Sequence, residues 1–138
     1  RKGAVAVELA LTAPVLILIL VLLVEGGRAL AFGAAIEKGL GAGVMYVARS
    51  TLPLGAAATG AVENLVKRGT VDTSAPLLVP GWSDAAASVA VTRLADYVTN
   101  GVAVPVFRVT ARVPFTPILP YWSPFTIELS HEQAYIGR

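Results

Sequence analysis

The chain has 138 residues, enough for one modest domain; 55% are hydrophobic and only 14% are charged. An average soluble domain has about a quarter charged residues, so lipid or other subunits must cover much apolar surface. A formal net charge of +2, with no basic run interleaved with aromatic residues, argues against a nucleic-acid partner. The absence of cysteine excludes disulfides and thiolate metal sites, and a single histidine, His131, excludes any site that needs two.

The N-terminal segment is apolar and long enough to cross a membrane. Residues 4–24 would span about 30 Å as a helix, the thickness of a bilayer core. Arg1 and Lys2 precede this run, so the positive-inside rule places them in the cytoplasm and the rest of the chain outside. A secretory signal peptide fits poorly, because Glu8 lies inside the run and no small-residue cleavage site follows it.

The helical pattern continues well beyond the length that one bilayer needs. We expect one helix from about Ala4 to Ser50, roughly 70 Å long, ended by Pro53. Glycines in its second half weaken an isolated helix but permit close approach between helices, which indicates a packing helix. These glycines are Gly26, Gly27, Gly33, Gly39, Gly41 and Gly43.

Glu8 is the most informative residue of the apolar segment, because a carboxylate in hydrocarbon is costly unless it is neutralised or paired. One interpretation is a protonated or snorkelling side chain near the cytoplasmic face. The other interpretation is that Glu8 pairs with a cation of a neighbouring subunit. Cleavage after Gly3 would supply the α-ammonium of Ala4; without cleavage, Arg1 or Lys2 would serve. Either pairing would set the register between subunits.

Pro14 interrupts the backbone hydrogen bonding of the same helix. It has no N–H, and its ring crowds the carbonyl of Ala10. Two interpretations remain open: a kink tolerated in a transmembrane helix, or a local bend that lets the helix repack on leaving the membrane.

The rest of the chain predicts a small αβ head. We expect a second helix over 56–68 and a loop over 70–84. Strands are expected over 87–94, 104–113 and 126–136, forming an antiparallel sheet on the outer half of the long helix. The middle strand alternates Phe, Val, Ala and Val on one face with Arg, Thr and Arg on the other. Asn100–Gly101 is a hairpin signal between the first two strands, although their connection is long for a tight turn.

A proline-rich apolar loop follows at residues 114–124. It contains more large apolar side chains than a loop normally exposes, so it either folds over its own small core or forms a contact patch for the next subunit or the membrane surface. The residues of this patch are Phe115, Ile118, Leu119, Tyr121 and Trp122.

No catalytic constellation is present in the sequence. It has no phosphate-binding glycine loop with lysine, no Gly-x-Ser-x-Gly and no calcium-loop spacing among its acidic residues. His131 is interpreted as an exposed or partly packed side chain. We therefore predict no enzyme activity, no cofactor and no metal.

The first sixteen residues, RKGAVAVELALTAPVL, resemble the start of TadE-like pilins of the tight-adherence system, which are relatives of type IV pilins. Glu25, Arg28 and Ala48–Arg49 are similar to the family's helix, and residues 107–120 look like its late strand and proline-rich turn. The resemblance is weakest over residues 54–100.

The resemblance implies a pilin-like α+β fold and a place for each N-terminal residue. A prepilin peptidase would cut between Gly3 and Ala4, and Glu8 would be the assembly glutamate. The subunit interface would also include Pro14 and four charged residues of the helix. These four are Arg1, Lys2, Glu25 and Arg28.

We accordingly expect residues 1–52 to form a transmembrane and filament-core helix and residues 53–138 an extracellular head. The expected function is that of a structural subunit of an adhesive surface filament, which leaves the inner membrane to assemble with copies of itself or with other pilins. Its other expected partners are the prepilin peptidase and the pilus assembly machinery. The alternative is a single-pass inner-membrane protein whose head binds a partner without polymerising. The glycine-rich apolar continuation of the helix beyond Val24 favours the filament.

Overall fold

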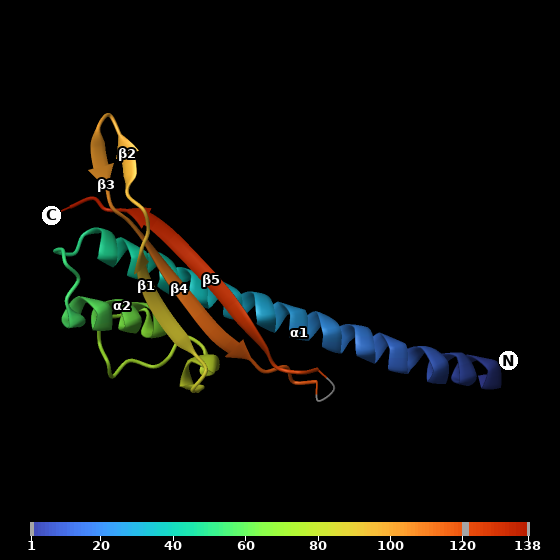
Figure 1. Cartoon of the computed structure of the whole chain (residues 1–138). Helices are drawn as coiled ribbons and strands as arrows, with labels where there is room; N and C mark the ends of the chain where they lie inside the picture. The colour runs from blue at the N-terminus through green and yellow to red at the C-terminus, as the bar shows by residue number, and fades with distance from the viewer. Residues whose placement is uncertain (1, 120–121, 138) are drawn as a thin grey trace. The chain divides into compact units, whose positions relative to one another are not determined.

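The structure, a computed structural model, describes residues 2–119 and 122–137. The predicted α+β class, with a long apolar helix, a short second helix and small antiparallel sheets, is confirmed (Figure 1). The elements in chain order are α1 (Lys2–Ala48), α2 (Ala56–Arg68), the 3₁₀ helix η1 (Pro80–Ser83), β1 (Ser88–Arg93), β2 (Tyr97–Thr99), β3 (Val102–Val104), β4 (Val106–Phe115) and β5 (Phe125–Ala134).

The chain divides into two compact units, Arg1–Ala31 and Phe32–Arg138, and α1 contributes residues to both. The first unit is a stretch of helix that continues through Pro14. The second, which we call the head, contains the last part of α1 and all the other elements. The functional division at residues 52 and 53 stays a prediction.

The core of the head lies between the last part of α1, α2 and one face of the sheet. Figure 1 shows β4 between β1 and β5, with the last part of α1 crossing the sheet. The buried apolar side chains from these elements are Ile36, Leu40, Val44 and Val47 of α1, Val62 and Val66 of α2, and Phe107, Val109, Ala111 and Val113 of β4. Burial of this apolar surface is what stabilises the head.

Two glycines of α1 allow α2 to pack closely against it. A Cβ atom built at Gly39 would lie 2.4 Å from the backbone oxygen of Val66, and one at Gly43 would lie 2.8 Å from Cγ2 of the same valine. Real Cβ atoms essentially never come this close, so a side chain at either position would force a neighbouring atom to move. The close approach expected from the glycines is therefore made by these two within one chain, whereas a Cβ at the other four would meet nothing within 4 Å.

Helix α2 has the bounds that its sequence predicts. Gly69 follows its last residue with φ +74° and donates its N–H to the carbonyl oxygen of Leu65 at 2.9 Å, so the glycine ends the helix in the left-handed region. The following segment, expected to be a loop, contains η1, which begins at Pro80 and buries Trp82. A proline at the first position of a helical turn needs no N–H partner, which explains where this turn begins.

The sheet has the strand order β1-β4-β5 and is antiparallel throughout. The inward and outward faces of β4 alternate as predicted: Phe107 and Val109 are buried, whereas Arg108 is exposed. Strand β4 continues two residues beyond the predicted end, because Phe115 pairs with Phe125 of β5. On the outer face, Arg108 donates to Glu132 at 2.8 Å across the two strands.

The hairpin signal belongs to a separate two-stranded ribbon. Strands β2 and β3 pair with each other, with Tyr97 opposite Val104, and they stand between β1 and β4 in the chain. Asn100 and Gly101 have φ of 50° and 77°, as a tight primed turn requires. This ribbon explains the length of the connection: the turn does not join β1 to β4 directly.

Candidate functional site

The first part of α1 exposes large apolar side chains around its whole circumference. The exposed fractions are 64% at Val5, 71% at Leu11 and 69% at Leu23. Among the described residues, one helix, Gly3–Ala48, is long and apolar enough to cross a membrane. An apolar surface of this extent is not stable in water, so lipid or protein must cover it.

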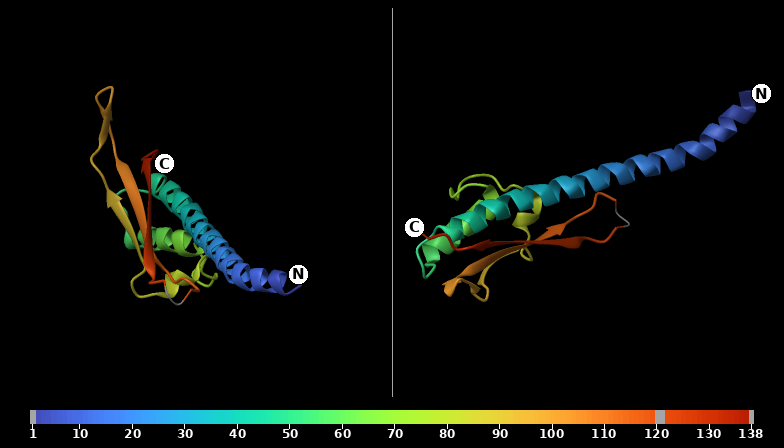
Figure 2. Two further views of the ribbon diagram at one scale, coloured as in Figure 1. Left: turned by 90° about the vertical axis from the view of Figure 1, so that its right-hand side faces the viewer. Right: turned by 90° about the horizontal axis from the view of Figure 1, so that it is seen from above.

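Glu8 and Pro14 lie in this part of α1, and Thr12 lies between them in the chain. The Thr12 hydroxyl donates to the carbonyl oxygen of Glu8 at 2.9 Å, and Pro14 offers no N–H to the carbonyl of Ala10. Both features weaken the local backbone ladder and favour bending. The right-hand view of Figure 2 shows the blue N-terminal turns of α1 changing direction in this region.

The Glu8 carboxylate has no hydrogen-bond or ion-pair partner in the described part of the chain. Gly3 and Ala4 lie in the first turns of α1 and are exposed. Arg1 and the side chain of Lys2 lie outside the described residues, so the structure does not place the two basic groups proposed for Glu8. The partner of Glu8 therefore stays a prediction.

Glu25 and Arg28, also expected at the subunit interface, meet within one chain. Nη1 of Arg28 donates to both carboxylate oxygens of Glu25, at 2.9 and 3.0 Å. Glu25 is buried, and the guanidinium supplies a charge that offsets the loss of water around it. A contact with a neighbouring subunit stays a prediction for both.

The proline-rich loop is only partly as expected. Phe115 is the last residue of β4 and is buried, with its ring 5.2 Å from that of Phe32 in an edge-to-face arrangement. It therefore belongs to the core and exposes almost no surface. Ile118 and Trp122 are exposed, at 63% and 49%, and Leu119 is half-buried. Tyr121 lies outside the described residues.

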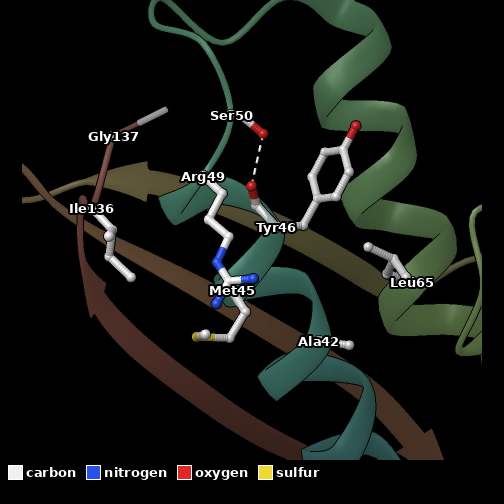
Figure 3. A pocket seen from close by; sticks show the side chains of 8 residues that line it. All are labelled: Ala42, Met45, Tyr46, Arg49, Ser50, Leu65, Ile136 and Gly137. Atoms are coloured by element: carbon white, nitrogen blue, oxygen red, sulfur yellow. Dashed lines mark hydrogen bonds between the residues drawn. The ribbon is translucent and has the colours of Figure 1, made fainter.

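The head also carries a shallow groove of about 600 Å³ over the last turns of α1. Figure 3 shows α2 beside it with Leu65, the C-terminal segment with Ile136, and the side chain of Arg49 directed toward Met45. The full lining is Ala42, Met45, Tyr46, Arg49, Ser50, Leu65, Ile136 and Gly137. The sequence could not reveal this groove, because three distant segments meet to form it.

The titratable groups of the head make local contacts. His131 Nε2 lies 3.6 Å from a carboxylate oxygen of Glu37; the histidine is half-buried, as expected for a partly packed side chain, and Glu37 is exposed. The backbone N–H and hydroxyl of Ser74 donate to Asp72, and these bonds lower the pKa of that carboxyl. Among the residues that the structure describes, no three acidic, histidine or cysteine side chains gather to hold a metal ion.

Comparison with known proteins identifies a family that part of the chain matches. Residues 3–61 match the family model described as TadE-like protein. No significant match was found among curated proteins or among solved structures. TadE-like proteins are associated with the Tad pilus and are not known as enzymes. The run 107–120 lies outside the matched residues, so its resemblance to the family stays a prediction. Over residues 3–61, which include the whole apolar part of α1, the chain is thus similar to the TadE-like protein family.

Proposed function

We propose that the chain is a structural, pilin-like subunit of an extracellular filament of the tight-adherence type. The observation that carries this proposal is the surface of α1. Large apolar side chains are exposed from Val5 to Val24, and the helix then continues to Ala48 without a break. A filament in which helices of many copies pack side by side would cover this surface once the subunits leave the lipid.

The continuation of α1 argues against a simple membrane anchor. About twenty residues suffice to cross a bilayer, and α1 has 47. Beyond Val24 its exposed positions include Leu30, which is 78% accessible, and small residues such as Gly27 and Ala34. An anchor has no need of an exposed apolar and small-residue face outside the membrane, whereas a bundle of helices uses such a face for close packing.

Before assembly the chain would reside in the inner membrane, with its basic N-terminus in the cytoplasm and its head outside. The match of residues 3–61 to the TadE-like family supports the prepilin peptidase, the assembly machinery and other pilins as partners. In the filament, Glu8 would pair with a cation of a neighbouring copy, from the N-terminal groups or from elsewhere on the chain. Leaving the lipid would then relieve the penalty of an unpaired carboxylate.

The test is the substitution Glu8→Ala in the full chain, expressed in cells that form filaments. We expect normal membrane insertion, because alanine is less costly in hydrocarbon, together with a strong loss of sheared surface filaments by electron microscopy. Glu128→Ala, which removes an exposed carboxylate from the outer face of the sheet, serves as the control and should leave filaments unchanged. Normal filaments from Glu8→Ala would contradict the assembly role.

Processing is tested on the same sheared material by intact-mass measurement. A chain that begins at Ala4 is the expected result if the bond after Gly3 is cut. A chain that retains Arg1 would reject cleavage at this bond and would leave Arg1 and Lys2 as basic groups for Glu8.

A further inference from the structure

We propose that the groove at the end of α1 is the docking site for the first two turns of α1 from a second copy, with Glu8 of that copy paired to Arg49. This inference rests on the proposed filament and names the contact that sets its register. It does not require an N-terminal ammonium, and it assigns a role to a residue that the N-terminal pairing leaves unused.

Charge complementarity identifies the occupant. From Gly3 to Val24 the only charged side chain is Glu8, and among the described residues that line the groove the only charged side chain is Arg49. Neither side chain has a hydrogen-bond or ion-pair partner among residues 2–119 and 122–137. Each apolar surface therefore presents one charge that has no partner in the described part of the chain, and the two charges are opposite. Covering either surface with an uncharged partner would leave an uncompensated ion, which is strongly unfavourable.

Size and shape agree with this occupant. The groove follows α1 from Ala42 to the end of the helix at Ala48, about 9 Å or nearly two turns, and continues to Ser50. The residues before Glu8, at positions 3–7, are glycine, alanine and valine, whose small side chains suit a shallow groove and let two helix backbones approach closely. Met45 and Ile136 provide apolar contact on the groove side.

The pairing also fixes the stagger between copies. All subunits of a polar filament point in the same direction, so the helices are parallel. Placing Glu8 opposite Arg49 then offsets the two copies by 41 positions along the chain, the difference between the two residue numbers. The apolar surface of α1 on the C-terminal side of Glu8 remains available for packing against further copies.

Charge reversal tests the pair. Glu8→Arg and Arg49→Glu should each reduce the yield of sheared filaments about tenfold or more, because each brings two like charges together, and the double variant should restore most of the yield. Lys38→Glu is the matched control: Lys38 is an exposed cation on the same helix, outside the groove, and its reversal should leave the yield within about twofold.

The outcomes separate this inference from the proposed function. Normal yield from Arg49→Glu, or a double variant no better than the single ones, would overturn the pairing. Loss of filaments in Glu8→Ala would still support assembly through Glu8. Circular dichroism and membrane content of Arg49→Glu should match the parent protein. If either falls, the double variant decides: recovery of its filament yield supports the pairing, and no recovery overturns it.

Disulfide cross-linking gives an independent measurement, because the chain has no cysteine of its own. Val5 lies three residues before Glu8 and Met45 four residues before Arg49, so the two become neighbours in the docked pair. Oxidised filaments of the variant Val5→Cys with Met45→Cys should give a ladder of multiples of the 14.3 kDa chain. Val5→Cys with Ala34→Cys, about 16 Å of helix below Met45, should not. Equal ladders from both, or a product with another protein, would refute docking of a second copy.

Discussion

The contact of Gly39 with α2 leads to a quantitative prediction about the head. In Gly39→Ala the new methyl group would lie 2.4 Å from the backbone oxygen of Val66, where at least 3.0 Å is needed. The atoms in the way belong to backbone, so α2 must move by at least about 0.6 Å, the difference between those two distances. Overpacking of this kind costs up to about 3 kcal/mol, and the better helix propensity of alanine returns about 1 kcal/mol. We expect a net loss of about 2 kcal/mol.

Gly41→Ala provides the matched control, because it makes the same chemical change two residues away where a Cβ would meet nothing within 4 Å. It should raise stability by up to about 1 kcal/mol through helix propensity alone. The two variants should thus differ by about 3 kcal/mol, or roughly 12 °C in melting temperature for a domain of this size. Thermal unfolding of the full chain in detergent, followed by circular dichroism, measures the difference. A Gly39→Ala melting temperature at or above that of the parent protein would refute the close packing of α1 and α2.

Two further substitutions test local features of the head. Gly101 has φ +77°, so Gly101→Ala should destabilise the β2–β3 ribbon by about 1 kcal/mol and speed its amide hydrogen exchange. The exchange of β4 should not change. Equal effects on the ribbon and on β4 would contradict a separate ribbon. Ser74→Ala should raise the pKa of Asp72 toward its ordinary value, as measured by NMR titration. Because the folded-state pKa is lowered, the stability that Asp72 contributes is present above its unfolded-state pKa and is lost as the pH falls through the folded value; an unchanged Asp72 pKa in the variant would contradict the assigned hydrogen bonds.

Local signals in the chain explain why the main elements could be predicted. The apolar run without proline from residue 15 to 52 predicts the second half of α1, and the glycine after Arg68 predicts the end of α2. The alternation in β4 predicts which of its side chains are buried, since successive residues of a strand face opposite sides. Each of these signals lies within one continuous segment of the chain.

Other features required the folded chain. Phe115 reads as part of an exposed loop because prolines surround it, yet pairing with β5 extends β4 and buries it. The hairpin signal at Asn100–Gly101 does not say which strands it joins. The groove around Arg49 needs three segments that are far apart in the chain.

Sequence alone determined that this chain has a long apolar helix carrying one carboxylate, Glu8, and a small αβ head, because helix length, hydropathy and strand alternation are local properties. Only the tertiary structure decided that Gly39 and Gly43 serve packing inside the head, whereas a Cβ at the other glycines of α1 would meet no neighbouring atom. Whether a glycine contacts α2 depends on where a second helix comes to rest, and the free energy that places it there comes from burying side chains distant in sequence.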